Sequence, residues 1–243
     1  MGGKDNFAVD RAVGDAMIKA IPGMRYMAAE NRKFVHRVAR DLVEKEGIRQ
    51  FLDVGTGIPT RPNLHEIAQR SAPEARVVYV DNDPIVLVHA RALMISGDEG
   101  RSEYISADLR APESILKDEV LGRTLNLEEP VGLTLIAILM LIADEDDPWS
   151  KVEALRDAMP SGSLLAITHP TADFAPDEVN EAVNAATGAG ITLVARPESE
   201  VRRFFGDWEL LEPGLVPVSS WRPDEPVENP KAAYYWAGLA RKP

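Results

Sequence analysis

One stretch of the chain decides its fold: Phe51-Leu52-Asp53-Val54-Gly55-Thr56-Gly57-Ile58-Pro59-Thr60. An apolar run over residues 48–54 ends in two glycines spaced one residue apart. This pattern predicts a buried strand followed by a tight turn, in which the backbone approaches a ligand. A second strand is predicted over residues 76–80, and Asp81 follows it at the place where a ribose-binding acid is expected. Together these features indicate an α/β sheet that binds a nucleoside-bearing cofactor.

The turn suits a ligand without phosphates better than it suits a dinucleotide. A dinucleotide fingerprint continues to a third glycine and opens a helix at once, because the pyrophosphate lies at the helix N-terminus. Here Pro59 stands at the third position, and the next helix is predicted to begin after Asn63, an N-cap with Glu66 as its capping-box partner. Asp53 would also repel a pyrophosphate. These residues disfavour a nicotinamide oxidoreductase.

The pattern Asp-x-Gly-x-Gly with an acid after the second strand resembles the class I S-adenosylmethionine-dependent methyltransferases. Residues 47–60, 77–84 and 219–224 resemble one bacterial family of that class, the S-adenosyl methyltransferases, whose acceptors are largely undefined. The resemblance covers nearly the whole chain. It implies a Rossmann-like three-layer α/β/α sandwich with a seven-stranded, mostly parallel sheet of order 3-2-1-4-5-7-6 and an antiparallel last strand. We expect residues 1–46 to form an N-terminal helical cap and residues 47–243 to form one methyltransferase domain.

The resemblance also implies S-adenosylmethionine as cofactor and assigns residues to it. The candidates are Asp53, Gly55, Thr56, Gly57, Asp81, Asn82, Asp108 and Leu109. Asp81 is expected to accept hydrogen bonds from both ribose hydroxyls, so that replacing it should barely alter folding stability. Asp83 precedes Pro84 and is instead expected to cap a helix. Asp108 matches the acid that contacts adenine in this class, although it also suits a turn before residues 111–112.

The acceptor side is less well defined. A fourth strand is predicted over residues 133–139, and Met140 follows where the family commonly has histidine, so the most obvious general base is missing. His169, in a loop expected after a fifth strand over residues 164–168, is a weak candidate for an acid or base, or simply a neutral turn histidine. Helices are predicted over residues 7–21 and 28–45. They are expected to line the acceptor pocket; the alternative is that they only pack against the rest of the protein. The candidate lining residues are Asn6, Phe7, Tyr26, Asn31, Arg32 and Met140.

Composition excludes several classes of partner. Of 243 residues, 27 are basic and 39 acidic, and the net charge of −12 repels a nucleic-acid backbone. The chain has no cysteine, and its four histidines lack metal-ligand spacing, so we expect no metal. The longest apolar run, residues 131–143, is too short to span a bilayer, and we expect no membrane contact and a cytoplasmic location. Residues 2–7 resemble a family motif that usually has further residues before it, so we expect a leading segment to be missing.

The sequence therefore supports a methyltransferase that acts on a small-molecule acceptor by in-line methyl transfer. The alternative is a protein that binds the cofactor or its product without transferring methyl groups; Met140 and the undefined family substrates motivate it. The sequence leaves the acceptor and the oligomeric state open. The closing strands of the sheet are expected over residues 208–211 and 233–240.

Overall fold

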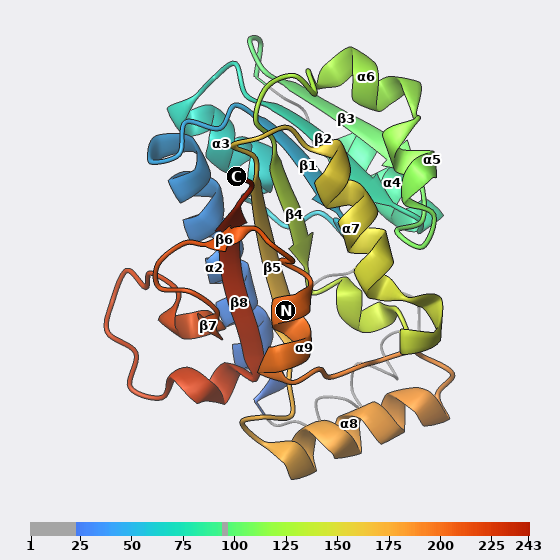
Figure 1. Ribbon diagram of the computed structural model, residues 1–243, viewed down its shortest axis with the longest axis vertical. Helices are drawn as coiled ribbons and strands as arrows, with labels where there is room; N and C mark the ends of the chain where they lie inside the picture. Colours follow the sequence, from blue (N-terminus) through green and yellow to red (C-terminus); the bar gives the residue numbers. More distant parts are fainter. Residues whose placement is uncertain (1–22, 94–96) are drawn as a thin grey trace.

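The computed structural model describes residues 23–93 and 97–243. Within them, one sheet forms the centre of the molecule and helices cover both of its faces (Figure 1). The strands are β1 (Gln50–Val54), β2 (Arg76–Asp81), β3 (Arg101–Ser106), β4 (Gly132–Ile136), β5 (Leu164–Pro170), β6 (Glu209–Leu210), β7 (Val216–Pro217) and β8 (Tyr235–Arg241). Their order is β3-β2-β1-β4-β5-β8-β6, and β7 pairs with β8.

The pairing confirms the predicted topology. Strands β1 to β5 run parallel, whereas β8 lies antiparallel to β5 with Ile167 opposite Gly238. The short β7 is an addition to the seven strands that were expected. In such a sheet the chain leaves β1 and β4 in opposite directions, and the carboxyl ends of these two strands border a crevice where ligands bind.

The helices divide between the two faces of the sheet. They are α2 (Met24–Glu44), α3 (Leu64–Ser71), α4 (Pro84–Leu93), α5 (Pro112–Leu116), α6 (Glu119–Thr124), α7 (Pro148–Ala158), α8 (Pro176–Gly188) and α9 (Glu198–Arg203). Short 3-10 turns occur at η1 (Leu139–Leu141), η2 (Asp144–Asp146), η3 (Val218–Ser220) and η4 (Pro230–Ala233). None of the helices in the described ranges is long and apolar enough to cross a membrane.

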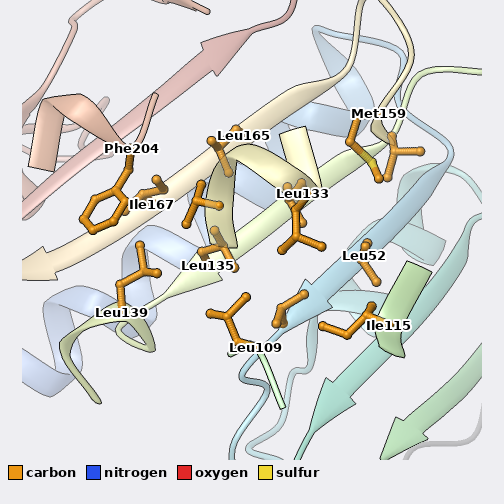
Figure 2. Packing of buried hydrophobic residues seen from close by; sticks show 14 of the residues in the cluster. Leu52, Leu109, Ile115, Leu133, Leu135, Leu139, Met159, Leu165, Ile167 and Phe204 are labelled. Atoms are coloured by element: carbon orange, nitrogen blue, oxygen red, sulfur yellow. The ribbon is translucent and has the colours of Figure 1, made fainter. Parts of the chain in front are cut away.

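Two apolar cores follow from the alternation of side chains along the strands. On one face, Leu52 and Leu133 pack in a cluster with residues of α5, α6, α7 and α9, and Figure 2 shows Leu165, Ile167 and Phe204 in the same cluster. On the other face, Phe51 packs with residues of α2 and α3. The parallel strands are therefore covered on both sides, as their apolar sequences require.

Helix α2 is fixed firmly on its face of the sheet. Its stripe of Phe34, Val38 and Leu42 is fully buried, because apolar residues four apart share one helical face. Arg37 donates hydrogen bonds of 2.8 Å to the carbonyl oxygens of Val218 and Trp221, which bind the helix to the C-terminal part of the chain. α2 begins at Met24, four residues earlier than predicted. The division between residues 46 and 47 stays a prediction, and the helix expected over residues 7–21 lies outside the described residues.

The boundaries of β4, β5 and β8 differ from those predicted. β4 ends at Ile136 rather than at residue 139, because Ala137 takes a left-handed conformation with φ of 54° and the chain turns into η1. β5 extends to Pro170, so His169 is a strand residue paired with Trp236 of β8, and the loop predicted there is wrong. β8 begins at Tyr235, because η4 and the left-handed Tyr234 precede it.

Candidate functional site

The glycine turn after β1 is shaped by two residues with positive φ, Gly55 at 79° and Gly57 at 64°. A β-carbon at Gly55 would lie 2.4 Å from the Ile138 side chain, so no other residue fits there without a shift. The turn leads to α3, whose predicted start is confirmed: the Glu66 carboxylate accepts a hydrogen bond of 2.7 Å from the Asn63 N–H.

Two hollows open on either side of this turn, among the described residues. The first, here called the α2 hollow, has a volume of about 330 Å³, and its lining includes Asn31, Arg32, Asp53, Thr56, Tyr79 and Tyr235. The second, here called the Asp81 hollow, measures about 80 Å³, and its lining includes Asp81, Asn82, Asp108, Leu109, Arg110 and Ile138. Gly55 lines both. A ligand that filled both hollows would therefore cross the glycine turn at the residue where a side chain is excluded.

Asp53 is the carboxyl group of the α2 hollow. Burial raises the pKa of Asp53 to about 6, while hydrogen bonding from Thr134 and Thr56 and the positive charge of Arg32 act in the opposite direction. The Thr134 hydroxyl, on the neighbouring strand β4, donates directly to this carboxylate. Because burial disfavours the charged carboxylate, a cation that enters the hollow would stabilise the charged form of Asp53.

Arg32 connects α2 to the glycine turn. Its guanidinium donates hydrogen bonds to the backbone carbonyl oxygens of Thr60 and Pro62. Burial lowers the pKa of Arg32, and the nearby carboxyl of Asp53 counteracts that shift. The hollow thus contains one cationic and one acidic side chain, which suits a ligand that carries both signs of charge.

Two polar atoms of the α2 hollow lack a partner. Asn31 Oδ1 and Arg32 Nε are buried, and neither has a hydrogen-bond partner in the part of the chain that the structure describes. A buried polar group without a partner costs about 1–3 kcal/mol. Both residues line the hollow, so a ligand there could satisfy them.

Asp81 does more than the sequence predicted. Its Oδ2 accepts a hydrogen bond of 2.8 Å from the Gly57 N–H, and its Oδ1 accepts one of 2.9 Å from the Asp83 N–H. The carboxylate therefore holds the glycine turn in place, and we now expect its removal to cost stability, contrary to the expectation from the sequence. Each carboxylate oxygen still has a lone pair for a ligand. Asp83 accepts a hydrogen bond of 2.8 Å from the Ile85 N–H, which confirms it as the cap of α4.

Asp108 lies at the far end of the Asp81 hollow and remains charged. Its carboxylate pairs with Arg110 at 2.6 Å and accepts a hydrogen bond of 2.9 Å from the Asn82 amide. The hydrogen bond from Arg110 is the largest of the causes that lower the pKa of Asp108 to about 2. Asn82 and Asp108, which come from neighbouring strand ends, are thus in direct contact, and Leu109 supplies the buried apolar wall beside them.

Three candidate residues lie away from both hollows. Tyr26, 39% exposed, lies on another side of α2 with Lys33 and Arg37. His169 is fully buried, with Nδ1 2.8 Å from the Pro170 carbonyl oxygen and Nε2 2.9 Å from the Arg196 guanidinium.

Burial is also the main reason that the pKa of His169 falls to about 3, so its ring stays neutral. We therefore do not propose His169 as an acid or base. Met140, the third of these residues, belongs to η1 and faces an apolar space beside the α2 hollow. Asn6 and Phe7 lie outside the described residues.

Among the residues that shape the hollows, sequence reasoning missed Tyr79, Thr134, Ile138 and Tyr235. Strand alternation could have found Tyr79, because it places Tyr79 on the same face as Phe51. Nothing in the sequence indicated that Tyr235, the first residue of the last strand, would line the α2 hollow. No group of three or more histidine, cysteine or acidic side chains that could hold a metal occurs in residues 23–93 and 97–243.

Comparison with known proteins decides the family. The model of one protein family, described as S-adenosyl methyltransferase, matches residues 1–243. The chain belongs to this family. The predicted class, an S-adenosylmethionine-dependent methyltransferase, and the predicted cofactor are thereby confirmed. A separate comparison with curated proteins found no match.

Two solved structures are similar to this methyltransferase over almost its full length. One is a DUF574 family protein from Streptomyces avermitilis, 45% identical, with a TM-score of 0.96, matched over 100% of this chain and 94% of the other. The second comes from Thermobifida fusca and is 41% identical, with a TM-score of 0.91 over 99% and 91% of the two chains. Human N-acetylserotonin methyltransferase, solved with SAM, is 14% identical over 100% of this chain and 60% of its own, with a TM-score of 0.53. That likeness confirms the Rossmann-like fold.

Proposed function

We propose that this methyltransferase holds S-adenosylmethionine across the α2 and Asp81 hollows and methylates a small-molecule acceptor that enters the α2 hollow. The observation that carries the proposal is the meeting of the two hollows at Gly55, at the carboxyl ends of β1, β2 and β4. A long ligand with a nucleoside at one end and an amino acid at the other matches this arrangement.

The residues present fit the cofactor on chemical grounds. In the Asp81 hollow, Asp81 retains acceptor capacity for ribose hydroxyls, and the apolar wall of Leu109 beside Asn82 and Asp108 suits a purine base with an exocyclic amine. In the α2 hollow, Asp53 and Arg32 offer one negative and one positive group. Arg32, whose Nε has no hydrogen-bond partner among the described residues, offers its positive charge to a carboxylate. These pairings match the zwitterionic end of S-adenosylmethionine.

When bound, S-adenosylmethionine supplies a methyl group on a positively charged sulfur, which an acceptor takes by in-line displacement. The side chains contribute chiefly by positioning and by excluding water. Arg32 ties the glycine turn to α2, and the Asp81 carboxylate holds the Gly57 N–H in place, so both ends of the turn are fixed before a ligand arrives. Among the described residues that line the α2 hollow, Asp53 supplies the carboxyl group that balances positive charge.

The size and charge of the site support a small acceptor. The volume of the α2 hollow, about 330 Å³, lies at the lower end of the range for small-molecule pockets. The net charge of −12 disfavours a nucleic-acid substrate. The cytoplasmic location expected from the sequence stays a prediction.

Isothermal titration tests where the cofactor lies. The parent and the Arg32→Met and Asp53→Asn variants would be titrated with S-adenosylmethionine, S-adenosylhomocysteine and NAD, with Arg25→Met as a matched surface control on the same helix. We expect both site variants to lose at least tenfold in affinity for the two sulfur compounds, and the control to match the parent. Tighter binding of NAD, or equal affinities in all variants, would contradict the assignment.

A second experiment separates a transferase from a protein that only binds the cofactor. The protein would be incubated with methyl-labelled S-adenosylmethionine and a metabolite extract, with an Asp81→Ala variant as the control for background labelling. Label that moves to a small molecule only with the parent supports transfer. Binding without any transfer to the extract would favour the alternative.

A further inference from the structure

An apolar space lies beside the α2 hollow, and Tyr235 lines both. It has a volume of about 70 Å³. Its lining includes Met24, Met27, Met140, Val179, Ala182 and Tyr235. These residues come from α2, η1, α8 and β8, four elements that are far apart in sequence. We call this space the Met chamber.

Tyr235 is the wall that the Met chamber and the α2 hollow share, because it lines both. Its backbone is held at the start of β8, opposite Pro170 of β5. Its hydroxyl donates to the Met140 sulfur at 3.8 Å, and a thioether is a weak acceptor. Burial raises the pKa of Tyr235 to about 12, so the phenol keeps its proton at neutral pH and can donate it to a stronger acceptor.

The two sides of Tyr235 differ in polarity. The α2 hollow is lined by Asn31, a polar residue whose Oδ1 has no hydrogen-bond partner among the described residues. The Met chamber presents methionine, valine and alanine side chains, which have no strong hydrogen-bonding group to offer. A molecule that extends past Tyr235 would therefore be polar at one end and apolar at the other. Methionine side chains are unbranched and rotate readily, so the chamber walls adapt to such a group.

We propose that the Met chamber is a subsite for a short alkyl group of the methyl acceptor, whose polar end lies in the α2 hollow near Asn31. This inference rests on the proposed function, because it places the acceptor in the α2 hollow. It identifies the acceptor class as a small amphipathic molecule that carries a hydroxyl or amine. An apolar cavity of about 150 Å³ accommodates benzene, so a chamber less than half that size takes about three carbon atoms.

Methionine methyl groups provide a direct readout. The protein would be labelled with carbon-13 at its methionine methyl groups, saturated with S-adenosylhomocysteine and titrated with straight-chain primary alcohols of two to six carbons. We expect the signals of Met24, Met27 and Met140 to shift. The signal of Met159, which is buried in the cluster on the other face of the sheet, should not move. Affinity should rise about fourfold for each added methylene until the chamber is full, and then level off.

Two substitutions on α8 sharpen the test. Ala182→Val adds two methyl groups to the chamber wall, whereas Ala185→Val makes the same change on the exposed side of the helix. We expect Ala182→Val to weaken alcohol binding at least tenfold, and Ala185→Val to leave it unchanged. Affinity for S-adenosylhomocysteine should stay within twofold of the parent in both. If Ala182→Val does not fold, Met140→Ala decides instead, because it enlarges the chamber and should move the optimum to longer alcohols.

The outcomes separate this inference from the function beneath it. Normal binding of S-adenosylhomocysteine without shifts at the three chamber methionines would mean that the Met chamber is only a packing void. Equal shifts at Met159 would mean nonspecific solvation, and would equally overturn the subsite. Failure to bind S-adenosylhomocysteine at all would instead refute the proposed function.

Discussion

Replacing Asp53 by asparagine should stabilise the ligand-free protein and weaken it as a binder of S-adenosylmethionine. Burial raises the pKa of Asp53 from 3.8 to about 6, which means that the folded protein disfavours the charged carboxylate. A shift of about two units corresponds to about 3 kcal/mol. Asparagine removes this cost but leaves Arg32 without its counter-charge. We therefore expect a net gain of about 1–2 kcal/mol in the free energy of unfolding at pH 8.

The gain depends on pH in a way that identifies its cause. Between pH 4 and 6 the folded parent binds more protons at Asp53 than the unfolded chain does, so its stability relative to the variant falls as the pH rises through this window. The difference between Asp53→Asn and the parent should be near zero at pH 4 and reach its full size above pH 6. Urea unfolding at pH 4 and pH 8 measures both values. The exposed Glu145→Gln, which removes one negative charge elsewhere, should show little difference at either pH.

Binding should change in the opposite direction. The cationic end of S-adenosylmethionine favours the charged form of Asp53, so the affinity of the parent should fall as the pH drops below about 6. The affinity of Asp53→Asn should be at least tenfold weaker at pH 8 and nearly independent of pH. A variant that is less stable than the parent at pH 8, or a stability difference that is the same at both pH values, would refute this reasoning.

Substitutions in and beside the glycine turn give two further predictions. Asp81→Ala removes the acceptor of the Gly57 and Asp83 N–H groups, so it should cost about 1–2 kcal/mol of stability and at least tenfold in cofactor affinity. Asp83→Ala removes a helix cap, so it should cost about 0.5–2 kcal/mol of stability but leave cofactor affinity within twofold of the parent. Thermal unfolding and titration with S-adenosylhomocysteine distinguish the two, and normal affinity in Asp81→Ala would contradict the site. Gly55→Ala should destabilise the protein by about 1–3 kcal/mol and abolish cofactor binding, because its β-carbon meets Ile138. A β-carbon at Gly57 would meet nothing within 4 Å, so Gly57→Ala should cost only about 1–2 kcal/mol of backbone strain. Equal losses of binding in the two glycine variants would argue against a close approach at Gly55.

Features set by local chemistry could be predicted from the sequence. The glycine turn, the capping box of Asn63 and Glu66, and the Asp83 cap each depend on residues only a few positions apart. The strand order could be predicted because the chain resembles one family over nearly its whole length.

Features set by distant parts of the chain could not be predicted. β4 looks apolar through residue 139, yet Arg196 donates to the carbonyl oxygens of Leu139 and Ile142 and holds them outside the sheet. His169 became a buried strand residue because it pairs with Trp236 and its ring stacks on Phe204. These contacts join segments that no local pattern connects.

The candidate site shows the same limit. The sequence identified Asp53 and Asp81 as candidates. It gave no indication that the Asp81 carboxylate accepts a hydrogen bond from the backbone of the glycine turn. Tyr235 reaches the α2 hollow only because β8 inserts between β5 and β6. Tyr26 and Asn31 lie on different sides of α2. Which side faces the hollow depends on how the helix packs on the sheet, and the spacing of residues in the sequence does not determine that.

A crystal structure of the protein with S-adenosylhomocysteine tests the central claim most directly. The account predicts the ribose at Asp81, the base beside Leu109 and Asp108, and the amino acid end between Asp53 and Arg32, with the ligand crossing Gly55. A product bound elsewhere, or bound with its amino acid end outside the α2 hollow, would contradict it.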